Sequence, residues 1–250
     1  MVKTLFSFFL FLQSSFAHAA PIVENWKVIH EAFFNGREVR EAKEQISIQA
    51  PEQAEDASLV PFAFKADFAS HIIQKIYLFT DANPILHTAT FFPASNTQQF
   101  SVSTRIRLEK NSVVRVIAET QEGTLWMAQA NIRTPGGGCG GGGYSDEAQL
   151  RESAGKMKLR HQENTQFAFN IKHPMRTGFE RTAQGYFAKA WYINHLSFKN
   201  GDLELLKIEV GPGISADPYF LFSTQQVVQT IWVEAKDNED KVFQQNFIFD

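Results

Sequence analysis

Apolar and polar residues alternate along much of the chain, which is the pattern of β-strands with one buried face. The clearest run is 100–108, where every second residue is apolar or threonine and the residues between them are serine or arginine. Similar runs cover 112–120 and 124–132, and the Gln-Glu-Gly sequence at 121–123 predicts a hairpin turn between them. This part of the chain is therefore predicted to form an antiparallel sheet.

A second region of the same kind begins near His161 and runs to the last residues. Its turns are predicted at Asn200-Gly201 and Asp237-Asn238. The strand-like runs are 165–171, 192–198, 203–210, 229–235 and 242–249. No helical pattern alternates with these strands, so a parallel sheet is not expected. Many short strands separated by turn residues predict an all-β protein with two β-sandwich domains.

The N-terminus has a different pattern. Lys3 precedes an apolar run from Leu5 to Phe16, and Ala17-His18-Ala19 offers the small residues that a signal peptidase accepts. The run is shorter than the ~20 residues of a membrane-spanning helix. We therefore expect a signal peptide over residues 1–19 and export to the periplasm; a buried helix or an uncleaved anchor is the alternative.

A short helix is expected after the signal peptide. Trp26, Ile29 and Phe33 follow a helical spacing, and Asn35-Gly36 ends it.

The two β regions are separated by residues 135–160, which lack strong periodicity and predict a flexible linker. This segment contains the only cysteine of the 250-residue chain, Cys139. It is flanked by the glycines that we expect to form a mobile arm: Gly136, Gly137, Gly138, Gly140, Gly141, Gly142 and Gly143. A single cysteine cannot form a disulfide within its own chain, so it is a free reactive thiol, an intermolecular bridge or an incidental residue of a linker.

An exposed arm would let this thiol enter the active site of another protein. Cys139 lies four positions after Pro135, and an extended chain of that length reaches roughly 13–14 Å from the fold. We expect residues 135–147 to be exposed and the thiol pKa to lie near its free value of ~8.5. A buried, packed Cys139 would weigh against a carrier function.

Other kinds of site have weaker support. The glycines match a dinucleotide-binding pattern, but no strand–loop–helix context accompanies them. The histidines are scattered and lack the spacing of metal ligands, so neither a metal nor a cofactor is expected. A net charge of −3 without a basic run argues against binding to nucleic acid or to an anionic membrane. Aromatic residues make up 13% of the chain and include 24 Phe, which predicts a large apolar interface between the domains.

The glycine-flanked cysteine at 137–141 resembles the carrier arm of SoxY, a protein of bacterial thiosulfate oxidation, and the stretches 50–62, 76–94 and 102–128 extend this resemblance. The stretches 171–185 and 211–222 resemble SoxZ, the partner of SoxY. The chain thus resembles a SoxY–SoxZ fusion. The domains expected are a signal peptide (1–19), a SoxY-like sandwich with the arm (20–141), a linker (142–160) and a SoxZ-like sandwich (161–250).

The resemblance implies two docked immunoglobulin-like sandwiches, no catalysis by the chain itself, and Cys139 as the covalent attachment point for a small sulfur compound. It also implies haem c, hydrolase and molybdenum enzymes of sulfur oxidation as partners. In SoxY the arm ends the chain, whereas here about a hundred residues follow Gly143. An internal arm enters a partner folded back on itself and needs a wider tunnel. The alternative is therefore an accessory or carrier protein of a quinoprotein dehydrogenase with a different cargo.

Overall fold

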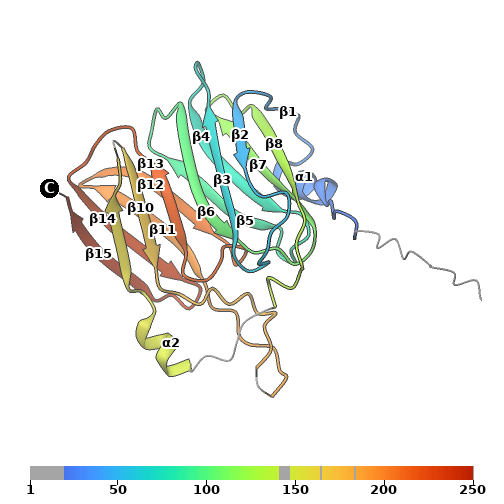
Figure 1. Cartoon of the computed structure of the whole chain (residues 1–250). Coiled ribbons are helices and arrows are strands. Elements are labelled where there is room, and N and C mark those ends of the chain that lie inside the picture. Colours follow the sequence, from blue (N-terminus) through green and yellow to red (C-terminus); the bar gives the residue numbers. More distant parts are fainter. Residues whose placement is uncertain (1–19, 141–146, 164, 183, 250) are drawn as a thin grey trace, which may run out of the picture.

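The computed structural model describes residues 20–140, 147–163, 165–182 and 184–249, and strands make up most of its regular structure (Figure 1). The described helices are α1 (Trp26–Phe34) and α2 (Glu147–Ser153). The N-terminal half of the chain contains β1 (Val39–Glu41), β2 (Ile46–Gln49), β3 (Val60–Asp67), β4 (Ile73–Thr80), β5 (His87–Pro93), β6 (Gln99–Ile106), β7 (Ser112–Thr120) and β8 (Leu125–Ile132). The C-terminal half contains β9 (Met157–His161), β10 (Gln166–Ile171), β11 (Ile193–Asn200), β12 (Leu203–Val210), β13 (Tyr219–Ser223), β14 (Thr230–Asp237) and β15 (Val242–Ile248).

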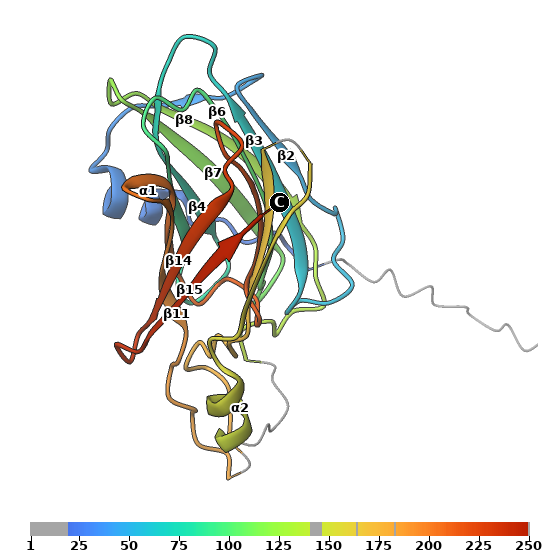
Figure 2. The same cartoon turned by 90° about the vertical axis from the view of Figure 1, so that its left-hand side faces the viewer.

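These strands form two sheets, and both sheets run through both halves of the chain. The nine-stranded sheet has the order β1-β8-β7-β4-β5-β12-β11-β14-β15, and the six-stranded sheet has the order β2-β3-β6-β13-β10-β9. The two halves of the chain meet in the nine-stranded sheet where β5 lies beside β12, and we call this boundary the join. Counted outward from the join, the strand orders β5-β4-β7-β8 and β12-β11-β14-β15 match: in each set of four, the strand that is second in sequence comes first, followed by the first, the third and the fourth. The halves are thus two sandwiches of matching topology joined edge to edge, as Figures 1 and 2 show.

The join has two antiparallel strand pairs and a shared core. Strand β5 pairs with β12 from Ala89↔Val210 to Pro93↔Leu206, and β6 pairs with β13 from Val102↔Phe222 to Thr104↔Phe220. Phe91 and Phe220 meet between the sheets with ring centroids 6.2 Å apart, and both are fully buried. One apolar cluster includes residues of both halves, which confirms the predicted apolar interface.

Local patterns predicted most of these elements. The run at 100–108 forms β6, with alternating buried and half-buried residues, and helix α1 ends where Asn35 takes a left-handed conformation. Strand β7 does not alternate, because both of its faces are covered. On one face Val116 belongs to the main apolar core, and on the other Ile117 packs under α1 beside Arg115, which forms a buried ion pair with Asp81. Among the described residues, no helix is long and apolar enough to cross a membrane.

The expected linker at 142–160 differs from the structure. Helix α2 occupies its middle, and β9 pairs with β10 from Met157 onward, so the second sandwich begins before His161. The helix is only seven residues long, and β9 is an edge strand with exposed charges at Lys158 and Arg160, so neither gives a strong periodic signal. The expected signal peptide, residues 1–19, lies outside the described residues.

Because the core crosses the join, we predict that Phe220→Ala lowers the free energy of unfolding by about 3–5 kcal/mol, as large buried side chains do. The matched control is Phe187→Ala, since Phe187 is 59% exposed, and it should cost no more than ~0.5 kcal/mol. Urea denaturation followed by circular dichroism measures both. The halves should unfold in one transition, and two separate transitions would contradict a shared core.

Candidate functional site

The chain leaves β8 at Ile132 and runs along the N-terminal half toward the join. Arg133 still donates its amide to the Glu52 carbonyl, at 2.9 Å. Further on, the Gly137 amide donates to the Glu109 carbonyl at 2.9 Å, and the Gly138 amide donates to the Leu108 carbonyl at 3.1 Å. We call residues 135–140 the thiol segment. It is held by backbone hydrogen bonds against the loop that follows β6.

Cys139 lies between the two halves and contacts both. Its amide donates to Glu109 Oε2 at 3.1 Å, and its carbonyl oxygen lies 2.8 Å from Thr177 Oγ1 in the C-terminal half. The residue is only 3% exposed. Its crevice is lined by Asn83, Pro84 and Ile85 of one half and by Thr177, Phe179, Pro212 and Gly213 of the other.

Buried charged residues hold the loop that contains Thr177. The Glu180 carboxylate accepts hydrogen bonds from the Thr177 and Gly178 amides, each at 2.9 Å. Arg107 pairs with Glu180 at 3.2 Å and also donates to the Pro174 carbonyl at 3.1 Å. Arg107 and Glu180 belong to different halves, so their ion pair ties the loop that contacts Cys139 to the join. They also line a wider cleft of about 900 Å³ on the side of α2.

The surroundings of Cys139 keep its thiol protonated. Burial raises the pKa of Cys139 to about 12, and the negative charge of Glu109 adds to this effect, while Arg107 offsets part of it. A thiol with this pKa is almost entirely neutral at pH 7, and the thiolate is the nucleophilic form. In the docked position Cys139 is therefore held in the protonated, less nucleophilic form.

The expectation of an exposed arm is wrong for Gly138 and Cys139, which are buried, whereas Pro135, Gly137 and Gly140 are exposed as expected. Gly136 and Gly137 have φ of 88° and 77°, and a Cβ on Gly138 would lie 2.1 Å from the Ala57 carbonyl oxygen. The glycines therefore do more than loosen the chain, because they let the backbone turn and approach its neighbours closely enough to dock. Gly140 lies in the same docked stretch, whereas Gly141, Gly142 and Gly143 lie outside the described residues.

No pattern in the sequence pointed to the residues that hold the thiol segment. Thr177 and Glu180 fall within the stretch that resembles SoxZ, yet nothing in their spacing connects them to Cys139, 38 positions from Thr177. Glu109 and Arg107 follow β6 and appear as ordinary surface charges in the alternating pattern. Within the described part of the chain, no group of three or more His, Cys, Asp and Glu side chains is placed to hold a metal ion.

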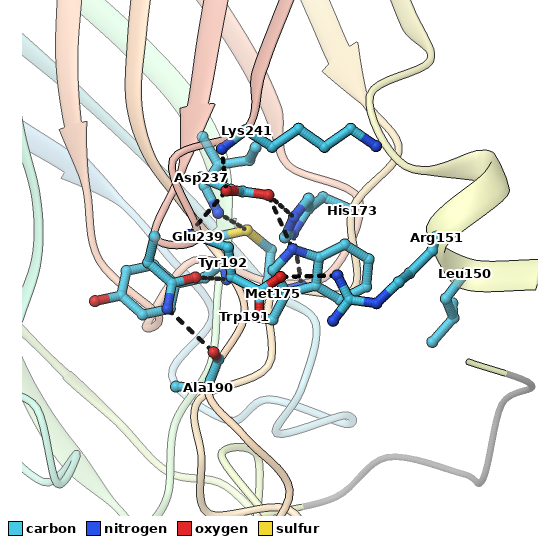
Figure 3. Close-up of polar contacts among 12 residues, drawn as sticks. Leu150, Arg151, His173, Met175, Ala190, Trp191, Tyr192, Asp237, Glu239 and Lys241 are labelled. Atoms are coloured by element: carbon cyan, nitrogen blue, oxygen red, sulfur yellow. Dashed lines mark hydrogen bonds and ion pairs between the residues drawn. The ribbon is translucent and has the colours of Figure 1, made fainter. Parts of the chain in front are cut away.

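Beyond the glycines, helix α2 is fixed to the C-terminal half (Figure 3). Arg151 lies over the ring of Trp191, 4.3 Å from its centroid, and forms an ion pair with Glu239 at 2.7 Å. Hydrogen bonds from Arg151 and Lys189 lower the pKa of Glu239 to about 2. Glu147, at the start of α2, pairs with Arg176. Both sides of the thiol segment are thus attached to the folded body.

Beneath Trp191 lies a buried histidine. His173 packs edge-on against the Trp191 ring with centroids 4.7 Å apart, and its Nδ1 accepts the Met175 amide at 3.2 Å. The neutral ring therefore carries its proton on Nε2, which faces Asp237 Oδ2 at 3.9 Å. Asp237 also accepts the Trp191 indole N–H at 2.9 Å. Burial lowers the pKa of His173 to about 4, although the charge of Asp237 opposes this shift.

The fold and the site define a protein of two joined β-sandwiches that keeps one thiol at their junction. Family models agree with this division. The model described as "Sulfur oxidation protein SoxY" matches residues 30–139, and that described as "Sulphur oxidation protein SoxZ" matches residues 156–247. The chain is a SoxY–SoxZ fusion and belongs with the sulfur-oxidation proteins. The SoxY match ends at Cys139 itself.

Solved structures give partial matches. The sulfur carrier protein SoxY from Chlorobium limicola f thiosulfatophilum is 27% identical, with a TM-score of 0.37, and the match covers 43% of this chain and 88% of that one. A superoxide reductase (neelaredoxin) from Ignicoccus hospitalis is 19% identical, with a TM-score of 0.29 and coverage of 36% and 80%. A putative superoxide reductase from Thermotoga maritima is 15% identical, with a TM-score of 0.28 and coverage of 39% and 92%. A search of curated proteins finds no match.

Docking should suppress the reactivity of Cys139. We predict that iodoacetamide alkylates the native protein at pH 8 at least ~10-fold more slowly than a peptide of residues 133–143, because the docked thiol is neutral and covered. The native rate should keep rising above pH 9, where the peptide rate levels off. Mass spectrometry of quenched samples measures both, and protein unfolded in urea is the control. Equal rates for native protein and peptide would contradict docking.

The buried His173 predicts a loss of stability in acid. Its folded pKa of about 4 lies below the ordinary 6.5, so protonation favours the unfolded chain. The stabilisation is complete above pH 6.5 and is lost as the pH falls toward 4, by up to roughly 3 kcal/mol. In denaturant titrations between pH 7 and 4, the free energies of unfolding of wild type and His173→Asn should converge as the pH falls. The control, His71→Asn at a partly exposed site, should stay parallel to wild type, and a parallel His173→Asn curve would refute the assignment.

Proposed function

We propose that this protein is a periplasmic carrier that holds sulfur intermediates covalently on Cys139 and presents them to enzymes that oxidise sulfur compounds. The position of its single cysteine carries the proposal: Cys139 ends the SoxY match and lies where the SoxY and SoxZ halves meet. The family domains support a carrier role in sulfur oxidation, and proteins of these families are carriers or adaptors rather than enzymes.

The reactions proposed at Cys139 follow from the chemistry of a thiol. Joining thiosulfate to Cys139 forms a sulfur–sulfur bond, releases the thiol proton and passes two electrons to an oxidant, for which a haem c partner is suited. Hydrolysis of the resulting S-thiosulfonate then releases sulfate and leaves a persulfide on the cysteine. A molybdenum enzyme is suited to oxidise that remaining sulfur. Each bond at Cys139 is reversible by attack at sulfur, which is what a carrier needs.

The burial of Cys139 is the observation that weighs against a carrier function, and it limits the form that the proposal takes. A permanently extended arm is incompatible with Cys139 at 3% exposure. A carrier that alternates between docked and released positions is compatible, because the thiol segment is held mainly by hydrogen bonds. The SoxY and SoxZ halves also meet around Cys139, so the arrangement uses both parts of the fusion. The alternative, service to a quinoprotein dehydrogenase, draws no support from any contact in the described residues.

The proposal predicts a modified cysteine. Protein isolated from the periplasm of cells grown on reduced sulfur compounds should carry sulfur adducts on Cys139 that a reductant removes. Cys139→Ser should fold normally and carry none, because a serine oxygen cannot form the sulfur–sulfur bond. Intact-mass spectrometry before and after reduction, paired with a thermal melt, tests both statements. A wholly unmodified thiol under these growth conditions would refute the carrier function.

A further inference from the structure

The two sheets have edges of unequal character. Within the described part of the chain, the nine-stranded sheet ends at β1 and β15, and the six-stranded sheet ends at β2 and β9. Strands β1 and β2 are only three and four residues long, and β9 carries Lys158 and Arg160. Short length and charged side chains are common ways in which an edge avoids pairing with another chain. Strand β15 has neither, because it is seven residues long and its sequence, VFQQNFI, contains no charged residue.

The strand that corresponds to β15 in the other half is covered. Counted outward from the join, β8 holds the position in the N-terminal half that β15 holds in the C-terminal half. Strand β8 pairs with β1 from Val39↔Leu125 to Glu41↔Met127. No strand of the described chain covers β15 in this way, and β15 forms the outer border of its sheet in Figure 1. The free edge of β15 is thus available to a strand from another chain.

The register with β14 shows which backbone groups of β15 face outward. At one end the Phe249 amide donates to the Gln229 carbonyl at 2.8 Å, and at the other end the Lys241 carbonyl accepts the Asp237 amide at 3.0 Å. Bonding alternates along an antiparallel pair, so the odd-numbered residues from 241 to 249 bond to β14. The even-numbered residues direct their amide and carbonyl groups out of the sheet edge: Val242, Gln244, Asn246 and Ile248.

The sequence of β15 is nearly the same in both directions. Read from Val242 it is Val-Phe-Gln-Gln-Asn-Phe-Ile, and read from Ile248 it is Ile-Phe-Asn-Gln-Gln-Phe-Val. We propose that β15 is a self-association site, where the β15 strands of two copies of this chain pair antiparallel about a two-fold axis at Gln245. Such a contact uses the same surface on both copies and closes after two subunits. The inference is independent of the proposed carrier function.

This register satisfies the backbone groups of both edges. Gln244 of one copy lies opposite Asn246 of the other, and Val242 lies opposite Ile248, so each outward-facing residue meets another outward-facing residue. Each of these pairs exchanges two N–H···O=C hydrogen bonds. A shift of one residue would place outward-facing groups opposite groups that already bond to β14. The alternation along β15 therefore permits an axis at Gln245.

The same register matches the side chains. Val242 is 48% exposed and Ile248 is 77% exposed, and the contact brings these two apolar side chains together at each of its ends. On the opposite face of the sheet, Phe243 lies opposite Phe247, and both already pack against the main core. Apolar and aromatic pairs of this kind stabilise neighbouring strands. Only uncharged amides meet at the centre, so no charged group loses its water.

Association through β15 leaves the join uncovered. Three strand spacings, roughly 14 Å, separate β15 from β12 at the join. Cys139 lies at the join, in a crevice that Pro212 and Gly213 line just after β12. A dimer formed through β15 therefore carries two separate thiol sites. Loss of self-association would leave the chemistry of each thiol unchanged, so this inference and the carrier proposal fail independently.

Analytical ultracentrifugation of the full chain tests the contact. A reductant is present throughout, so Cys139 cannot link two chains through a disulfide. The average mass of the wild-type protein should rise from that of one chain toward that of two as its concentration approaches ~0.1 mM, and it should not pass two. A wild-type protein that stays monomeric, or that continues to larger assemblies, would overturn the inference.

Gln245→Lys tests the position of the axis. It places two lysines directly opposite each other, and like charges in that position destabilise a strand pair, so the dissociation constant should rise at least ~10-fold. Gln99→Lys is the matched control, because Gln99 is an exposed glutamine of β6, which has strand neighbours on both sides. Gln99 bonds to Asp67, which is an equally good partner for a lysine. A thermal melt checks that both variants stay folded, and equal dissociation constants in the two would refute the assignment.

A mixture of two variants tests the two-fold symmetry. Gln245→Glu alone should associate as poorly as Gln245→Lys, for the same reason. Mixed in equal amounts, the two variants should form a dimer again, because a lysine then faces a glutamate across the axis. If the mixture associates no more tightly than either variant alone, Gln245 does not lie on the axis and the proposed contact is wrong.

Hydrogen exchange at single-residue resolution tests the contact without any substitution. Raising the concentration of the wild-type protein should slow exchange several-fold at the even-numbered amides of β15, which gain partners only in the dimer. The odd-numbered amides already bond to β14 in each chain and should change less. Exchange that is the same in dilute and concentrated samples would contradict pairing at this edge.

Discussion

The pairing of strands across the join determines where the Cys139 thiol lies and which residues surround it. Strands β5 and β6 would be sheet edges in an isolated N-terminal sandwich, and β12 and β13 would be edges in an isolated C-terminal one. Exposed edges are unsatisfied and prone to pair with other chains. Here they pair with each other, which merges two cores into one. The same pairing brings the Asn83–Ile85 loop, Thr177 and Pro212 around Cys139, so neither half alone contains the site.

The docked thiol reveals a second role for the glycines that flank it. A run of glycines suggests freedom of movement, and in solution an unattached run would have it. The structure shows that the absence of side chains also permits an ordered, closely packed position, because Gly138 fits against the Ala57 carbonyl where no other residue would. Flexibility and docking are compatible, since glycine loses the most entropy on ordering and meets the fewest steric obstacles.

The fusion constrains this segment on both sides. In a carrier arm that ends the chain, one end is free; here β8 precedes the glycines, and α2 follows them and is bound to the SoxZ half through Arg151 and Glu147. A segment attached at both ends reaches outward as a loop. Under the proposed carrier function, the width of this loop restricts which active sites it enters, so the attachment of α2 to the SoxZ half would bear on the choice of partner.

The sequence by itself determined eight of the fifteen described strands and the chemical identity of the site. Alternation of buried and solvent-facing positions is local information, so runs such as 100–108 and the helix ending at Asn35 were predicted from neighbouring residues alone. The single cysteine among glycines was equally visible. The tertiary structure decided which strands form the join and whether the thiol is exposed. Strand β13 is short and was not predicted, yet it links the two halves through β6. The burial of Cys139 depends on Glu109 and Thr177, which are 30 and 38 positions away in opposite directions. Contacts over such separations depend on how the sheets pack, and no local pattern encodes them.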